Sequence, residues 1–188
     1  MVLDGSNDRR NGSPVADSEV VMARQMMPND ANPWGDVHGG TVMKMVDEAA
    51  GSAAIRHARC RVATAAIDYM SFLHPVHVGD LVTVMAAVND VGRTSMEVGV
   101  RVEAENMLTG ERNHTSSAYV VMVALDDDGR PIRVPPVIAV APEQKRRQAA
   151  ARIRRAQRKV LEAKLKESAG ELGRPVPVAT DLVEAPTT

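Results

Sequence analysis

Aromatic residues are almost absent from this chain of 188 residues: Phe, Trp and Tyr together make up 2% of it, although 44% of the residues are hydrophobic. A folded core must therefore be built from Val, Ala, Met, Leu and Ile. The length suits one domain of ordinary size with additional tails. The formal net charge of -1 gives no overall attraction to nucleic acid or to an anionic membrane.

Cysteine and long apolar runs are also scarce. Cys60 is the only cysteine, so an intrachain disulfide is impossible and a reducing compartment is indicated. Residues 1–8 lack the apolar centre of a signal peptide, and no run approaches the roughly 20 apolar residues of a transmembrane helix. These absences predict a cytoplasmic protein without membrane attachment, and they do not favour nucleic acid as a partner.

The order of the remaining patterns is one strand, one long helix and then four strands joined by short turns. The helix has apolar residues at spacings of three and four, and the strands alternate between apolar and polar residues. This order predicts an antiparallel sheet with a segregated helix, which is the α+β class. The expected elements are a strand over 19–26, a helix over 39–57, and strands over 61–72, 81–88, 94–103 and 112–125.

The composition changes after residue 137. A second helix is predicted over 143–167, with ten Lys and Arg residues against three Glu residues, which leaves a charge of +7. Because the whole chain is nearly neutral, the remainder must be acidic. We expect this helix to be solvated or packed in an oligomer, rather than to grip coenzyme A phosphates or bind nucleic acid, since it lacks aromatics for base stacking. The predicted organisation is a disordered tail over 1–16, a domain over 17–137, a basic helical extension over 138–167 and a second disordered tail over 168–188.

A glycine pair opens the central helix. The backbone N–H groups of Gly39 and Gly40 lack partners within the helix, and the helix dipole adds positive potential there. Glycine also lets a ligand approach the backbone closely. The pair is a candidate oxyanion site for a carbonyl group. The alternative is that it only serves a tight turn.

An acidic pair, Asp47 and Glu48, lies inside the same helix. Asp47 is eight residues from Gly39, or about 12 Å along the axis at 1.5 Å per residue. A catalytic base must lie within about 3 Å of the group from which it takes a proton. If both ends of the helix are catalytic, they must therefore serve different sites, which predicts an obligate dimer with composite sites. The alternative is an ordinary solvent-facing carboxylate.

Other catalytic chemistries find little support in the sequence. His74 and His77 flank Pro75-Val76 without the spacing of a zinc site, so no metal site is predicted. Ser116 and Ser117 lack a Gly-x-Ser-x-Gly elbow. Cys60 has no evident activating neighbour.

Several motifs follow one another along residues 17–137. They are Gly35-Asp36-Val37-His38-Gly39-Gly40-Thr41, Lys44-Met45-Val46-Asp47-Glu48-Ala49-Ala50-Gly51, Arg56-His57, the strand 62–72, Gly92-Arg93-Thr94-Ser95-Met96-Glu97-Val98 and Arg133-Val134-Pro135-Pro136. Together they resemble the hotdog-fold acyl-CoA thioesterases, specifically the cytosolic acyl-CoA hydrolase branch. The resemblance implies a single hotdog domain in which an antiparallel sheet wraps a long central helix.

The same resemblance implies that the protein hydrolyses fatty acyl-CoA without a metal or redox cofactor. Asp47 takes the place of the catalytic carboxylate, as base or nucleophile, and Asp36 takes the place where some members have asparagine. Two subunits at least would share each site, and such dimers often form a trimer of dimers. The remaining implied site residues are His38, Gly39 and Gly40 for the oxyanion, Ser71 and Phe72 for the thioester channel, and Arg93, Thr94 and Ser95 for coenzyme A.

Two other functions stay open at this point. Some hotdog proteins are enoyl-CoA hydratases with an Asp/His pair, and His38 is the only histidine close enough in sequence to fill that motif. A hydratase would turn over enoyl-CoA without releasing a thiol. A non-catalytic acyl-CoA-binding or sensor protein would bind acyl-CoA and leave it intact, and the intact acidic pair argues against it.

Overall fold

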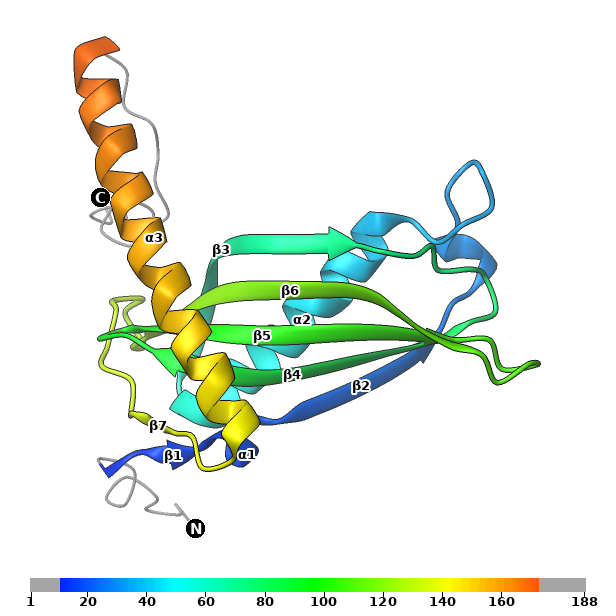
Figure 1. The fold of residues 1–188 in the computed structure, drawn as a ribbon, viewed down its shortest axis with the longest axis horizontal. Coiled ribbons are helices and arrows are strands. Elements are labelled where there is room, and N and C mark those ends of the chain that lie inside the picture. Colours follow the sequence, from blue (N-terminus) through cyan, green and yellow to red (C-terminus); the bar gives the residue numbers. More distant parts are fainter. Residues whose placement is uncertain (1–10, 173–188) are drawn as a thin grey trace.

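The computed structural model describes residues 11–172. Five strands form one antiparallel sheet in the order β2-β4-β5-β6-β3. Helix α2 packs behind this sheet and helix α3 crosses in front of it (Figure 1). The main elements are β2 (Val20–Gln25), α2 (Gly39–Ala58), β3 (Arg61–Phe72), β4 (Leu81–Val91), β5 (Ser95–Glu105), β6 (Arg112–Leu125) and α3 (Pro142–Leu172).

Helix α2 is the centre of the core. Its buried stripe consists of small and medium apolar residues, which let the sheet approach the helix closely. His38 caps the N-terminus, and Arg59 ends the helix in the left-handed conformation with φ of 56°. The buried residues of the stripe are Val42, Met45, Val46, Ala49, Ala50, Ala53 and Ala54. The predicted α+β architecture with a long central helix is confirmed.

The sheet presents alternate side chains to α2, so Val82, Val84 and Val88 of β4 are fully buried there. The opposite face of the sheet carries the polar side chains that meet α3. Strand β3 lies at one edge and is paired only with β6 among the described strands. Tyr69 and Phe72 on β3 are 56% and 53% exposed. A long, exposed edge strand is a template for pairing with another chain.

The packed structure begins before the predicted end of the N-terminal tail. Ser13–Pro14 (β1) pairs in parallel with Val137–Ile138 (β7), and Val15–Ser18 forms the short helix α1. Ser13 N–H donates to the Pro136 carbonyl at 2.8 Å, and Ser13 is buried. The prediction of disorder is therefore wrong for residues 11–16, because a distant segment supplies their partners. Residues 1–10 lie outside the described part.

The C-terminal helix agrees with its prediction in type but is longer at both ends. It runs from Pro142 to Leu172, whereas 143–167 was predicted. The predicted tail beyond residue 172 lies outside the described residues. Within residues 11–172, no helix is long and apolar enough to cross a membrane.

Candidate active site

Asp47 lies two turns inside α2 and faces strand β3. The hydroxyl of Thr64 donates a hydrogen bond of 2.6 Å to Asp47 Oδ1. Among the described residues, none donates a hydrogen bond to the other oxygen, Oδ2. Asp47 is half-buried, so a carboxylate fixed through one oxygen keeps its second oxygen available for a ligand or a water molecule. The pair has the arrangement of an oriented general base or nucleophile.

The N-terminus of α2 offers one open amide rather than three. His38 N–H donates to the Asp30 carbonyl at 2.8 Å, and Gly40 N–H donates to His38 Nδ1 at 3.0 Å. No described residue accepts a hydrogen bond from Gly39 N–H. Of the three predicted oxyanion donors, Gly39 is therefore the one whose amide is unoccupied, and His38 acts as the helix cap.

The ring of Phe72 borders the open Gly39 amide. A Cβ atom added at Gly39 would lie 3.6 Å from the Phe72 ring, so glycine leaves a narrow gap beside this aromatic side chain. Ser71, its neighbour on β3, pairs in register with Ser117 of β6. The structure thus brings the predicted channel residue Phe72 to the helix N-terminus, 33 residues from Gly39 along the chain.

Asp36 is held by a residue that the sequence did not indicate. Its Oδ1 lies 2.8 Å from Nδ1 of His77, and the two residues form an isolated backbone bridge. His77 N–H also donates to Asp80 Oδ2 at 2.9 Å. Asp36 and His77 are therefore a hydrogen-bonded pair beside the helix N-terminus. No group of three metal-ligating side chains occurs anywhere in residues 11–172.

The turn between β4 and β5 carries the predicted coenzyme A contacts Arg93, Thr94 and Ser95. Its backbone is anchored at several points: Thr94 accepts from Ala124 N–H at 2.9 Å, and Arg93 accepts from Val134 N–H at 3.1 Å. Gly92 N–H closes the turn on the Ser95 carbonyl at 2.7 Å. The Arg93 side chain is exposed, as a phosphate ligand must be.

These residues form two groups in a single chain. Thr64 is in register with Met122 of β6, and Met122 with Met96 of β5, so the Asp47 pair lies at the end of the sheet that holds the β4–β5 turn. Gly39 and Phe72 lie toward the other end. Eight helical residues separate Asp47 from Gly39, about 12 Å along the axis. One chain does not bring the carboxylate and the open amide to one carbonyl group.

A cavity of about 450 Å³ lies elsewhere, between α3 and the outer face of the sheet. Arg101, Ser117, Tyr119 and Arg154 are among its lining residues, and none of the predicted catalytic residues borders it. This cavity in the single chain is therefore separate from the Asp47–Thr64 pair.

Several known proteins similar to this chain are named for one activity. The thioesterase superfamily model matches residues 35–111. The uncharacterized acyl-CoA thioester hydrolase YkhA of Bacillus subtilis is 37% identical over 128 residues, which are 68% of this chain and 74% of that protein. The mouse cytosolic acyl coenzyme A thioester hydrolase is 37% identical over 133 residues; these are 66% of this chain, which spans only 35% of the mouse protein.

Solved structures similar to this chain include further acyl-CoA thioesterases. An apo-hexameric acyl-CoA thioesterase superposes with a TM-score of 0.76 at 41% identity, covering 78% of this chain and 94% of that one. The acyl-CoA hydrolase of Staphylococcus aureus, in complex with butyryl coenzyme A, coenzyme A and coenzyme A disulfide, superposes with a TM-score of 0.79 at 31% identity, covering 86% and 99%.

Spacing identifies two residues that the sequence interpretation missed. Structures of the Staphylococcus aureus hydrolase carry alanine in place of an asparagine, an aspartate and a threonine that are separated by 15 and 17 residues. Asn32, Asp47 and Thr64 have the same two separations here. Asn32, which the sequence interpretation treated as part of a loop, therefore has the spacing of the substituted asparagine.

Proposed function

This chain belongs to the hotdog-fold acyl-CoA thioester hydrolases of the thioesterase superfamily, and from that premise we propose that it hydrolyses fatty acyl-CoA to a free fatty acid and coenzyme A. The observation that carries the proposal is the 2.6 Å hydrogen bond from Thr64 to Asp47, which orients a half-buried carboxylate on the central helix. The spacing that Asn32, Asp47 and Thr64 share with the Staphylococcus aureus hydrolase supports it.

Asp47 would act on the thioester in one of two ways. As a general base, its Oδ2 takes a proton from water while the water oxygen attacks the carbonyl carbon. As a nucleophile, the carboxylate attacks that carbon itself and forms an anhydride that water then cleaves. In both routes the C–S bond breaks, and the coenzyme A thiolate leaves and takes up a proton. Thr64 holds the carboxylate in the orientation that either attack requires.

The oxyanion donor would come from a second chain. An open N–H group at a helix N-terminus is well suited to a developing negative charge. Gly39 is too far along the helix from Asp47 to act with it in one chain, so each site combines Asp47 and Thr64 with Gly39 of the partner subunit. The exposed edge of β3 supplies the means of association. Antiparallel pairing of two β3 edges about an axis near Asp68, halfway between Thr64 and Phe72, would set Thr64 opposite Phe72 of the partner subunit.

The β4–β5 turn would receive the coenzyme A part of the substrate. Arg93 is exposed for the phosphates, and Thr94 and Ser95 lie beside it at the end of the sheet that holds Asp47. We expect no metal or redox cofactor. The hexameric thioesterase among the similar structures supports a trimer of dimers, and the cytosolic relative supports a cytoplasmic location.

Two substitutions test the mechanism and the composite site together. Asp47→Asn keeps the shape of the side chain and removes its base, and we expect thiol release from acyl-CoA to be lost while the fold and oligomer remain. Gly39→Pro removes only the open N–H group, because proline is favoured at the first position of a helix. Gly39→Ala keeps that group and serves as the control. Retained activity in Asp47→Asn would refute the proposed role of this residue.

Mixing Asp47→Asn with Gly39→Pro distinguishes a site shared by two subunits from a site complete within one chain. In a mixed dimer one site receives both changes and the other receives neither. When the chains are refolded together in equal amounts, half of the dimers are mixed, and recovery of about a quarter of wild-type activity is expected. If each chain held a complete site, mixing would recover nothing.

The hydratase alternative has one observation in its favour, the pair formed by Asp36 and His77. A hydratase would add water to an enoyl-CoA and leave the thioester intact. Thiol release from a saturated acyl-CoA therefore excludes it as the sole activity, and it also excludes a sensor that binds acyl-CoA without cleaving it. His77→Ala should leave thiol release largely unchanged if this pair has no part in the hydrolysis.

A further inference from the structure

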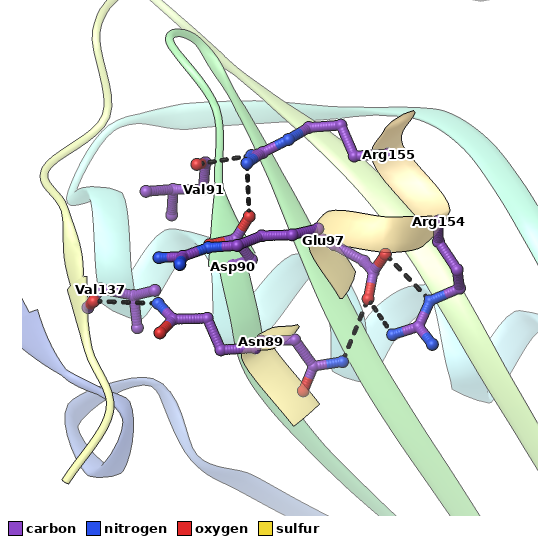
Figure 2. Close-up of polar contacts among 9 residues, drawn as sticks. Asn89, Asp90, Val91, Glu97, Val137, Arg154 and Arg155 are labelled. Carbon is purple, nitrogen blue, oxygen red and sulfur yellow. Dashed lines mark hydrogen bonds and ion pairs between the residues drawn. The ribbon is translucent and has the colours of Figure 1, made fainter. Parts of the chain in front are cut away.

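Helix α3 is attached to the outer face of the sheet by arginines. Arg154 binds Glu97 of β5 through two nitrogens, at 2.7 and 3.2 Å. Arg152 and Arg155 both reach Asp90 of β4, at 3.4 and 2.7 Å. Figure 2 shows Arg155 reaching Asp90 and Arg154 reaching Glu97. Farther along the helix, Arg158 pairs with Asp68 on the edge strand β3.

The two carboxylates require this helix. Asp90 and Glu97 are cross-strand partners, because a bulge after Val88 shifts the register so that Asp90 faces Glu97. They are 4% and 5% exposed. Like charges directly opposite each other on two strands destabilise a sheet, and buried charges are costly unless they are paired. The arginines of α3 supply the compensating charge.

Arg155 reaches beyond this pair to the turn that follows it. One nitrogen, Nη2, binds Asp90 Oδ2 at 2.7 Å, and the other, Nη1, donates to the Val91 carbonyl at 2.6 Å. The guanidinium also lies beside the turn itself, because a Cβ atom at Gly92 would be in van der Waals contact with Nη1 at 3.6 Å. Arg155 therefore fixes the last two residues of β4, from which the turn carrying Arg93, Thr94 and Ser95 begins.

We propose that Arg155 is a positioning residue for the coenzyme A site: it acts through Asp90 and the Val91 carbonyl to hold the β4–β5 turn where it can receive the nucleotide end of the substrate. This inference rests on the proposed function. Both outer nitrogens of Arg155 are engaged by the protein, so the effect on substrate passes through the turn. The basic extension is thereby part of the active-site structure, although its sequence lies outside the motifs of the family.

The test compares two substrates that carry the same acyl group. One is the acyl-CoA and the other is the acyl-pantetheine thioester, which lacks the nucleotide. Arg155→Lys keeps the positive charge, but it replaces the rigid two-nitrogen fork that reaches Asp90 and Val91 with one ammonium group on a shorter side chain. We expect KM for acyl-CoA to rise about 10-fold or more, with kcat changed less than about twofold. Both constants for acyl-pantetheine should match those of the wild type.

Controls separate positioning from general weakening of the helix. Arg146→Ala removes an arginine of the same helix whose one ion-pair partner within residues 11–172 is Glu143, on an exposed surface, and it should leave the kinetics with both substrates unaffected. Asp90→Asn removes the other half of the contact and should reproduce the selective rise in KM. If Arg155→Lys folds poorly, the two substrates are compared with Asp90→Asn instead, at a temperature below the melting temperature of that variant.

Three results would overturn the inference. They are an equal loss for acyl-CoA and acyl-pantetheine, a loss in kcat with KM unchanged, and wild-type kinetics in both Arg155→Lys and Asp90→Asn. If the wild-type protein released no thiol from any acyl-CoA, the proposed function would fail first. Normal wild-type hydrolysis with any of the three results would refute only the role of Arg155.

Discussion

Removing Arg154 should destabilise the protein far more than neutralising the glutamate with which it pairs. The side chain of Glu97 is 4% exposed and that of Arg154 is 22% exposed. In Arg154→Met the Glu97 carboxylate stays buried beside Asp90, and Asn89 Nδ2 at 3.2 Å is the one side-chain hydrogen-bond donor left to it in the described part of the chain. Breaking a buried ion pair in this way costs about 3–5 kcal/mol. The change also removes the stacking of the guanidinium 3.5 Å above the Tyr119 ring.

Glu97→Gln should cost much less. It removes the repulsion between Glu97 and Asp90, and it leaves a cation that reaches solvent. The double variant Arg154→Met with Glu97→Gln has no unpaired charge, so it should recover most of the loss seen in Arg154→Met alone. Urea unfolding followed by circular dichroism, at one fixed protein concentration, measures all three free energies of unfolding.

An exposed pair provides the matched control. Arg112 pairs with Glu105 near the surface, and Arg112→Met should cost at most about 1 kcal/mol. Two results would refute the reasoning. One is a cost for Glu97→Gln equal to that for Arg154→Met, and the other is a double variant as unstable as Arg154→Met alone.

Two further predictions concern the catalytic pair and the start of α3. Thr64→Val keeps the shape of the side chain and removes a hydrogen bond to a carboxylate, which is worth about 1.5–3 kcal/mol. The value of kcat/KM should therefore fall roughly 10- to 150-fold with the oligomer unchanged. Steady-state kinetics and sedimentation test this, and a loss below twofold would contradict it. Hydrogen bonds from Arg146 and then Arg147 lower the pKa of Glu143 to about 2 from 4.5. Because the folded value is the lower one, this contribution to stability is present above pH 4.5 and is lost as the pH falls toward 2. Glu143→Gln should therefore reduce the change of the melting temperature across that interval.

Periodicity predicted the elements well where local sequence decides the structure. The ends of β3 and β6 match the predicted ranges, and helix α2 differs from its prediction by one residue. Strand β4 was predicted to end at residue 88 because Asn89 and Asp90 have the chemistry of a turn. It continues to Val91, since arginines more than 60 residues away neutralise Asp90 and the pairing with β5 resumes after the bulge. That compensation cannot be read from a local window.

The candidate site shows the same division. The sequence identified Asp47 and the glycine pair, which lie on one helix at a spacing that a helix makes readable. It did not identify the hydrogen-bond partners of the two aspartates, because these partners are distant in sequence. Thr64 is 17 residues from Asp47, and His77 is 41 residues from Asp36. Nor could it show which amide stays open, since that depends on the Asp30 carbonyl and on the rotamer of His38.

The segregated charge of the chain has a structural cause. Of the ten basic residues predicted in the C-terminal helix, Arg152, Arg154, Arg155 and Arg158 pair with carboxylates on three strands of the sheet. The acidic sheet face and the basic helix are thus two halves of one interface, each unfavourable without the other. The change of composition after residue 137 marks where the second half begins. A protein shortened there would keep every motif of its family. Its Asp90 and Glu97 carboxylates, which lie next to the β4–β5 turn, would nevertheless lose the arginines that neutralise them.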